Sequence, residues 1–310
     1  MSSLRKAVED YLVLRRALGF KLQDMAAALR HFVSFMEREG ACTLTTNLAL
    51  RWAMQPQQVN PAHWTARLSF VRNFARHLSA IDPQTEIPPQ GLLPYRYHRC
   101  TPHLYTDDQI RRLIKAAWNL PPTTGLRPWT YSTLFGLLAV TGLRISEAIT
   151  LQQGDVDLNQ GLLTVRLTKF RKSRLVPLHP STARRLRRYA SKRDTFYPKN
   201  VTSHFFLSER GRPLTDCMVR WTFIKLSRQI GLRGPSDRFG PRLHDFRHRF
   251  AVTTLLQWYR SGFDVEQRLP SLSTFLGHTH VTDTYWYLWA VPELLTLSKD
   301  RLEKRWEVWP

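Results

Sequence analysis

The stretch from Arg242 to Tyr287 holds side chains that suit phosphate chemistry. It reads R-L-H-D-F-R-H-R-F-A and then, after an interval, F-L-G-H-T-H-V-T-D-T-Y-W-Y-L. Its reactive groups are two imidazoles, a guanidinium and a phenol, at His244, Arg247, His278 and Tyr287. A bound anion would meet hydrogen-bond donors and positive charge, and a tyrosine hydroxyl would be the nucleophile. The residue types therefore predict phosphate chemistry that needs no metal ion.

A zinc site is the competing interpretation of the same stretch. His244 and His248 lie four residues apart, as in a zinc metalloprotease helix, but aspartate stands where glutamate is expected. Arg247 would then lie beside the metal's positive charge, and the sequence places no clear third ligand. A two-metal nuclease would need several clustered carboxylates, which this basic region does not offer. We expect neither a metal nor another cofactor.

The cysteines indicate neither disulfides nor a metal site. Cys42, Cys100 and Cys217 are odd in number and far apart, which suits a reducing compartment. His98, Cys100 and His103 lie close together but lack a second ligand pair at zinc-site spacing.

The charge balance predicts a polyanionic partner. Across 310 residues, 46 Lys and Arg face 24 Asp and Glu, a net charge of +22 with a sequence pI near 10.7. Hydrophobic residues make up 43% of the chain, so a folded protein of about two domains is expected. Nucleic acid is the first candidate partner. The first residues form no apolar signal region, and we expect a cytoplasmic, nucleoid-associated protein without membrane contact.

The chain must bring distant elements to this stretch. Residues 1–80 show four or five amphipathic helices, and residues 81–105 are a Pro-rich linker. One helix face in the first region carries Arg67, Arg72 and Arg76. These arginines contact phosphates or form an ordinary solvated face, and the pattern leaves both open.

Residues 106–290 predict a second, larger domain. Thr106 is an expected N-cap, and a buried helix ends at the turn Thr141-Gly142-Leu143-Arg144. Between residues 155 and 178 the period changes to two, which predicts a β-hairpin with a basic tip. A short strand is expected at residues 205–207, and an amphipathic tail helix lies within residues 291–310. The fold class is therefore mainly α with a small antiparallel β-sheet.

Four blocks together resemble the tyrosine recombinase/integrase family. They are T-G-L-R-I-S-E-A from residue 141, T-K-F-R-K-S-R-L-V-P-L from residue 168, H-D-F-R-H from residue 244, and L-G-H with a following tyrosine. Their order and spacing match the family over residues 106–290. The helical first domain resembles the family's core-binding (SAM-like) domain in general character.

The resemblance implies a role for each matching residue. Arg144 and Arg247 would hold the non-bridging oxygens of a scissile DNA phosphate. Tyr287 would attack in line, leaving a 3′-phosphotyrosyl bond and a free 5′-hydroxyl, so that neither nucleotide cofactor nor metal is needed.

The remaining matching residues would assist proton transfer and phosphate binding. The resemblance makes Lys169, at the hairpin tip, the acid for the leaving oxygen, His244 the base toward the tyrosine, and His278 a phosphate contact. Further candidate DNA contacts are the basic residues of the first domain and hairpin: Arg67, Arg72, Arg76, Arg171, Lys172 and Arg174.

Two tyrosines compete for the nucleophile's position. On an uninterrupted helix, seven residues return to the face of His278 whereas nine do not, which favours Tyr285. The family spacing favours Tyr287. We predict Tyr287, because Gly277 should end one helix before Thr282 or Asp283 caps the next.

The resemblance implies a site-specific recombinase or integrase of a mobile element, acting in DNA integration or transposition. Double-stranded DNA and a homotetramer on synapsed DNA are the implied partners, with a free monomer or dimer, and accessory recombination proteins are further candidates. The tail at residues 291–310 would dock on a neighbouring protomer, and folding back onto its own chain is the alternative. The alternatives are a catalytically silent DNA-binding protein of the same fold and an enzyme like type IB topoisomerases.

Overall fold

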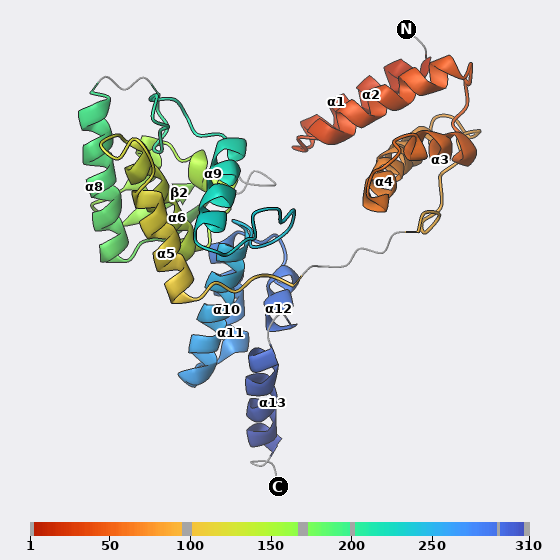
Figure 1. The fold of residues 1–310 in the computed structure, drawn as a ribbon. Coiled ribbons are helices and arrows are strands. Elements are labelled where there is room, and N and C mark those ends of the chain that lie inside the picture. Colours follow the sequence, from red (N-terminus) through yellow and green to blue (C-terminus); the bar gives the residue numbers. More distant parts are fainter. Residues whose placement is uncertain (1–2, 95–100, 167–172, 199–201, 290–291, 307–310) are drawn as a thin grey trace. The chain divides into compact units, whose positions relative to one another are not determined.

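The chain folds into two compact units, Met1–Cys100 and Thr101–Pro310, each with its own hydrophobic core (Figure 1). The computed structural model describes residues 3–94, 101–166, 173–198, 202–289 and 292–306. The family-like blocks all fall in the second unit.

The regular elements described in the first unit are all helices. Its helices are α1 (Ser3–Ala17), α2 (Gln23–Arg38), α3 (Thr46–Met54) and α4 (Pro61–Leu78). Asn60 caps α4 by accepting a hydrogen bond from the Ala62 amide, and Pro61 supplies a backbone angle suited to the first turn. Phe32, Trp52 and Phe74 are fully buried at the centre of the unit.

Residues 81–94, inside the range predicted as linker, pack on this unit. The Glu86 carboxylate accepts a hydrogen bond from the Thr46 amide at 2.7 Å. Arg72 donates to the carbonyls of Pro88 at 2.6 Å and Pro89 at 2.7 Å. Leu93 is buried in the same core. The Pro-rich segment is therefore held to the helices by Arg72 of α4, by the Thr46 amide of α3 and by burial of its own leucine.

The second unit is built around a buried helix. The elements here are α5 (Asp107–Trp118), α6 (Arg127–Thr141), α7 (Ile145–Ile149), α8 (Pro180–Phe196), α9 (Asp216–Gln229) and α10 (Asp245–Arg260). Helix α6 is apolar on nearly every side, and α5, α8 and α10 pack against it (Figure 1). As predicted, Thr106 caps α5, in a reciprocal capping box with Gln109.

The predicted hairpin is present in a small antiparallel sheet. Strands β1 (Val156–Asp157), β2 (Leu162–Val165) and β3 (Arg174–Pro177) pair in that order, with Val165 opposite Arg174 at the end nearest the tip. The tip residues 167–172, with Lys169, Arg171 and Lys172, lie outside the described residues. The expected strand at residues 205–207 is wrong, because the backbone there bonds mainly to side chains and makes only isolated bridges. The Leu207 amide donates to the Tyr189 hydroxyl, and the Leu207 carbonyl accepts from the Thr130 hydroxyl.

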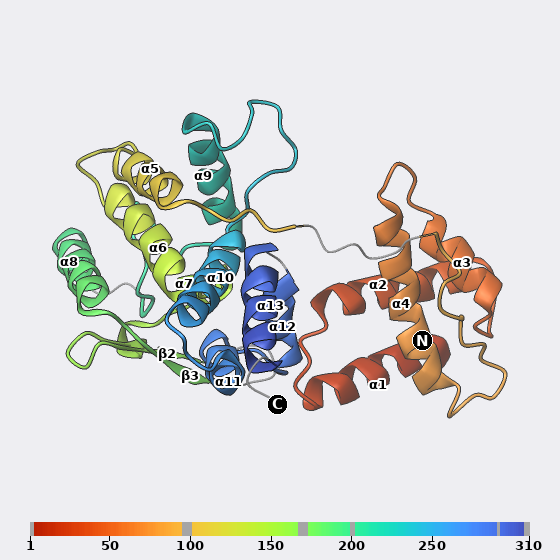
Figure 2. The same cartoon turned by 90° about the horizontal axis from the view of Figure 1, so that it is seen from below.

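The last three helices form a subsidiary core with α10. They are α11 (Val265–Leu276), α12 (Thr282–Trp289) and α13 (Pro292–Trp306). Figure 2 shows α12 and α13 side by side next to α10. Leu294 of α13 is fully buried in this core, and the Ser298 hydroxyl donates to the Tyr259 hydroxyl at 2.9 Å. Helix α13 thus packs on its own chain, and docking on a neighbouring protomer stays a prediction. Among the described residues, no helix is long and apolar enough to span a membrane.

Candidate active site

Arg144 is presented by a tight turn between α6 and α7. Gly142 ends α6 in the left-handed region at φ 61°, and a Cβ there would lie 2.9 Å from the ring of Phe250. Two residues later, the Arg144 amide donates to one Glu147 oxygen at 2.9 Å, and its Nη1 donates to the other at 2.8 Å. The Arg144 side chain remains 31% exposed, so its guanidinium can meet a ligand.

Arg247 lies at the bottom of the same site and is 1% exposed. Its Nη1 donates to the Gly142 carbonyl at 3.0 Å, and its Nη2 donates to the Leu276 carbonyl at 2.6 Å. Burial lowers the pKa of Arg247 to about 10, so the guanidinium stays charged at neutral pH. This one side chain therefore ties the turn after α6 and the end of α11 to α10.

The two imidazoles near these arginines are uncharged at neutral pH. Burial, followed by the charges of Arg247 and Arg144, lowers the pKa of His244 to about 4. The same causes lower the pKa of His278 to about 4. Asp245 acts in the opposite direction on His244, but its effect is outweighed. Nδ1 of His278 lies 2.7 Å from the hydroxyl of the buried Thr284, which fixes the ring.

The two tyrosines face different surroundings. Helix α11 ends at Leu276 and α12 begins at Thr282, so the spacing of one uninterrupted helix does not apply. The Tyr287 ring is 2% exposed and stacks on His278, with 6.0 Å between ring centroids. Tyr285 is 45% exposed and lines a separate crevice together with Tyr259 of α10.

His248 joins the cluster as a residue that the sequence interpretation assigned only to the zinc alternative. Its ring is 4.7 Å from that of His244 and 5.6 Å from that of Tyr287, measured between centroids. One signal was available in the sequence, because His248 lies one helical turn after His244 on the same face of α10. Among the described residues, no group of three or more His, Cys, Asp or Glu side chains gathers as a metal site.

Several candidate DNA contacts have intramolecular partners. Arg174 is 8% exposed in its side chain and donates two hydrogen bonds to Glu147. Arg67 lies 3.7 Å from the ring centroid of Trp52 and donates to the carbonyl of that residue. Arg72 donates to the Pro-rich segment, as described above, whereas Arg76 is exposed. Helical periodicity alone could not show which of these arginines has a partner inside the protein and which is exposed, because each partner is distant in the sequence.

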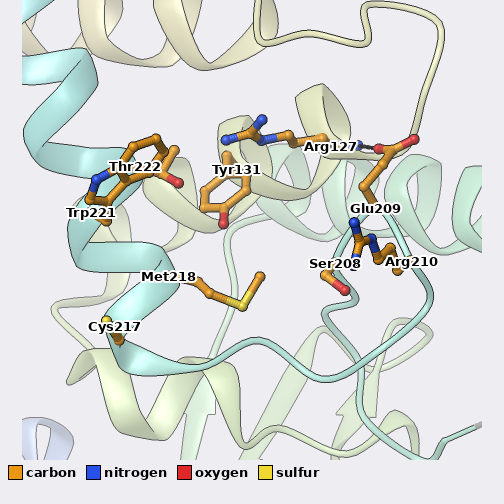
Figure 3. A pocket seen from close by; sticks show the side chains of 9 residues that line it. All are labelled: Arg127, Tyr131, Ser208, Glu209, Arg210, Cys217, Met218, Trp221 and Thr222. Atoms are coloured by element: carbon orange, nitrogen blue, oxygen red, sulfur yellow. Dashed lines mark hydrogen bonds between the residues drawn. The ribbon is translucent and has the colours of Figure 1, made fainter.

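An apolar cavity elsewhere in the second unit is lined by none of these residues (Figure 3). It measures about 460 Å³ and is bordered by Arg127 and Tyr131 of α6, the turn at residues 208–210, and one face of α9. Figure 3 shows the side chains of Met218 and Trp221 on α9 together with that of Tyr131. The polar cluster is thus a site of charged and aromatic groups, and the cavity is separate from it.

Comparisons with known proteins agree on one family. The family model described as the phage integrase family matches residues 104–292. The y4rB protein of Sinorhizobium fredii, named as an integrase/recombinase, is 50% identical over 99% of both chains. Tyrosine recombinase XerC of Chlamydia caviae is 28% identical over 93% of this chain and 94% of its own. The Tn1549 transposon integrase, solved with transposon right end DNA, has a similar fold, with a TM-score of 0.67 at 16% identity over 96% of this chain and 98% of its own.

Proposed function

The chain belongs to the phage integrase family and is a tyrosine-type DNA strand transferase, and on this premise we propose that Tyr287 is its nucleophile. Arg144, Arg247 and His278 hold the scissile phosphate in this proposal. The observation that carries it is the position of the Tyr287 ring, which is stacked on His278 beside the charge of Arg247.

The charge of the cluster supports an anionic ligand. Arg144, Arg174 and Arg247 contribute three positive charges, Glu147 contributes one negative charge, and the imidazoles of His244 and His278 are neutral. A buried excess of positive charge is costly unless an anion compensates it. A phosphodiester has the required charge, and its non-bridging oxygens suit the planar donors of arginine.

The proposed reaction keeps atoms and charges balanced. The Tyr287 oxygen attacks phosphorus and forms a 3′-phosphotyrosyl bond, while the bond to the 5′-oxygen breaks. Neutral His244 accepts the phenolic proton, directly or through the adjacent His248, and Lys169 donates a proton to the leaving 5′-oxygen. The Thr284 hydroxyl at Nδ1 leaves Nε2 of His278 to donate toward the phosphate. Attack by another 5′-hydroxyl reverses these steps and rejoins the strands.

We further propose that the substrate is duplex DNA of a mobile element and that two sites are exchanged within a tetramer. The net charge of +22 supports a DNA partner. The relatives named as integrases, and the transposon integrase solved with a transposon end, support the mobile-element role. Because Tyr287 is almost fully buried, DNA binding must also shift α12 enough to bring its hydroxyl to the phosphorus.

Covalent capture of DNA tests this proposal. The full chain is incubated with a pool of nicked duplexes of random sequence, because loss of the short 5′-hydroxyl fragment traps the phosphotyrosyl adduct. Denaturing electrophoresis then detects protein joined to DNA, and sequencing of the captured duplexes defines the preferred site. We expect the wild-type chain and Tyr285→Phe to form the adduct and Tyr287→Phe to form none.

The paired tyrosine variants make the result decisive. An adduct that is lost in Tyr285→Phe and kept in Tyr287→Phe would show that Tyr285, and not Tyr287, is the nucleophile. Sequence-selective binding without any adduct would instead favour a catalytically silent DNA-binding protein.

A further inference from the structure

Three arginines converge on three successive carbonyl groups at the end of α11. Arg174 Nε donates to the Phe275 carbonyl at 2.7 Å, and Arg247 Nη2 donates to the Leu276 carbonyl at 2.6 Å. Arg144 Nη2 donates to the Gly277 carbonyl at 3.3 Å. Carbonyls at a helix C-terminus lack partners within the helix and carry the negative end of its dipole. Hydrogen bonds to these carbonyls therefore explain why the three guanidiniums lie close together. They also place them near His278, the residue that follows Gly277.

Arg174 donates hydrogen bonds from all three of its guanidinium nitrogens to groups of the protein, whereas Arg144 and Arg247 each donate from two, among the described residues. Besides the Phe275 carbonyl, Arg174 binds both oxygens of Glu147, through Nη1 at 3.1 Å and Nη2 at 2.8 Å. Its side chain is only 8% exposed. A guanidinium with this set of partners is held at a fixed position and presents little surface to DNA.

Glu147 connects Arg174 to the exposed Arg144. The Glu147 residue is 7% exposed, and its two oxygens accept hydrogen bonds from both arginines. Burial raises the pKa of the Glu147 carboxyl, but the hydrogen bonds and charges of Arg174 and Arg144 together outweigh this effect and lower it, so the group stays ionised. With Arg174 sharing its charge, Glu147 can orient Arg144 without neutralising it. Arg144 then keeps positive charge and N–H groups for a phosphate.

Two features of the backbone bear on the position of Arg174. A Cβ on Gly277 would lie 2.6 Å from Arg174 Nη1, so the glycine leaves the space that the guanidinium occupies. Arg174 is also the β3 residue paired with Val165, at the end of the sheet nearest the tip that carries Lys169. Arg174 thus starts from a paired strand and places its guanidinium in the space beside Gly277.

We propose that Arg174 is a positioning residue for strand transfer, which sets the guanidinium of Arg144 through Glu147 and holds both against the end of α11. This inference rests on the proposed function, because it assigns Arg144 to the scissile phosphate. It replaces the sequence-based interpretation of Arg174 as a direct DNA contact.

The test compares binding with cleavage in matched variants. Arg174→Met removes the charge and keeps a long apolar side chain, Arg174→Lys keeps the charge but cannot bridge Glu147 and Phe275 together, and Arg184→Met is the control on the exposed face of α8. The substrate is a nicked duplex selected by covalent capture with the wild-type chain. At saturating DNA, we expect Arg174→Met to form the adduct about 100-fold more slowly, as a small misplacement of a phosphate ligand would cause.

Binding must stay unchanged if Arg174 acts only by positioning. We expect the affinity for this duplex, and its slope against salt concentration, to match those of Arg184→Met. A direct phosphate contact would instead reduce the slope by about one when it is removed. Weaker binding with a smaller slope and an unchanged cleavage rate would overturn the inference.

A double-mutant cycle identifies the residue through which Arg174 acts. If Arg174 works through Arg144, the double variant Arg144→Ala/Arg174→Met should be no slower than Arg144→Ala. Multiplied defects would overturn the inference, as would full activity in both Arg174 variants. Should Arg174→Met fail to fold, as judged by thermal melting, Arg174→Lys carries the same comparison with Arg144→Lys. Failure of the wild-type chain to capture any duplex would instead count against the proposed function.

Discussion

At the scale of single residues, the site depends on which groups are charged. Three arginines and one glutamate are ionised, whereas burial and the neighbouring arginines keep His244 and His278 neutral at physiological pH. A neutral His244 can accept the proton of a tyrosine, and a neutral His278 can donate one hydrogen bond without adding charge. The arginines that bind the phosphate in our proposal therefore also set the protonation state of the histidines.

The pKa of these histidines predicts the pH dependence of stability. Both values are about 4 in the folded chain and near 6.5 in an unfolded one, so between these limits the unfolded state binds more protons. The free energy of unfolding should therefore fall as the pH drops from about 6.5 to about 4. We expect the double variant His244→Gln/His278→Gln to show a shallower fall, measured by urea unfolding at several pH values. An equal slope in both proteins would contradict the low pKa values.

At the scale of elements, the end of α11 organises the site more than any strand does. Its last carbonyls accept hydrogen bonds from the arginine side chains. Gly277, which ends the helix, adopts the left-handed conformation at φ 69°, and His278 follows it directly. The break between Leu276 and Thr282 then lets α12 turn Tyr287 toward His278. A continuous helix over the same residues would have presented the other tyrosine.

Two glycines allow the role of this helix end to be measured. Gly277 and Gly262 both have left-handed backbone, at φ 69° and φ 72°, but a Cβ would meet Arg174 only at Gly277 and has open space at Gly262. Alanine at either position should cost about 1–3 kcal/mol of backbone strain. Gly277→Ala should in addition displace Arg174 and slow adduct formation, whereas Gly262→Ala should lower only the melting temperature. Equal cleavage rates in the two variants would show that the space beside Arg174 is not needed.

At the scale of the whole molecule, the two units divide the positive charge unequally. Residues 1–100 hold 13 Lys and Arg against 7 Asp and Glu, a net +6, and residues 101–310 hold 33 against 17, a net +16. All of the proposed catalytic residues lie in the second unit, which has its own core. Exposed Arg76 remains a candidate phosphate contact in the first unit.

A fragment of residues 101–310 should therefore keep the chemistry and lose part of the binding. We expect it to form the covalent adduct with a captured nicked duplex, but with weaker affinity than the full chain. The slope of affinity against salt concentration should also be smaller, because fewer counterions are released. Equal affinity and slope for fragment and full chain would assign all DNA contacts to the second unit.

The sequence by itself determined the family, the helical character with one hairpin, and most of the site. Short-range patterns were sufficient for features that neighbouring residues determine. These features are the helix cap at Thr106, the glycine that ends α6, and the hairpin of β2 and β3 with its alternating residues. The four blocks also identified Arg144, His244, Arg247 and His278 as candidates before their positions were known.

Only the tertiary structure decided which of several residues of the same type belongs to the site. It placed Tyr287 against His278 and Tyr285 in another crevice, brought His248 beside Tyr287, and buried Arg174 against Glu147. The physical reason is separation along the chain: Arg174 contacts a carbonyl 101 residues away, and Arg247 contacts one 105 residues away. Periodicity reports which face of an element is apolar, but the partner that a buried charge finds depends on how distant elements pack.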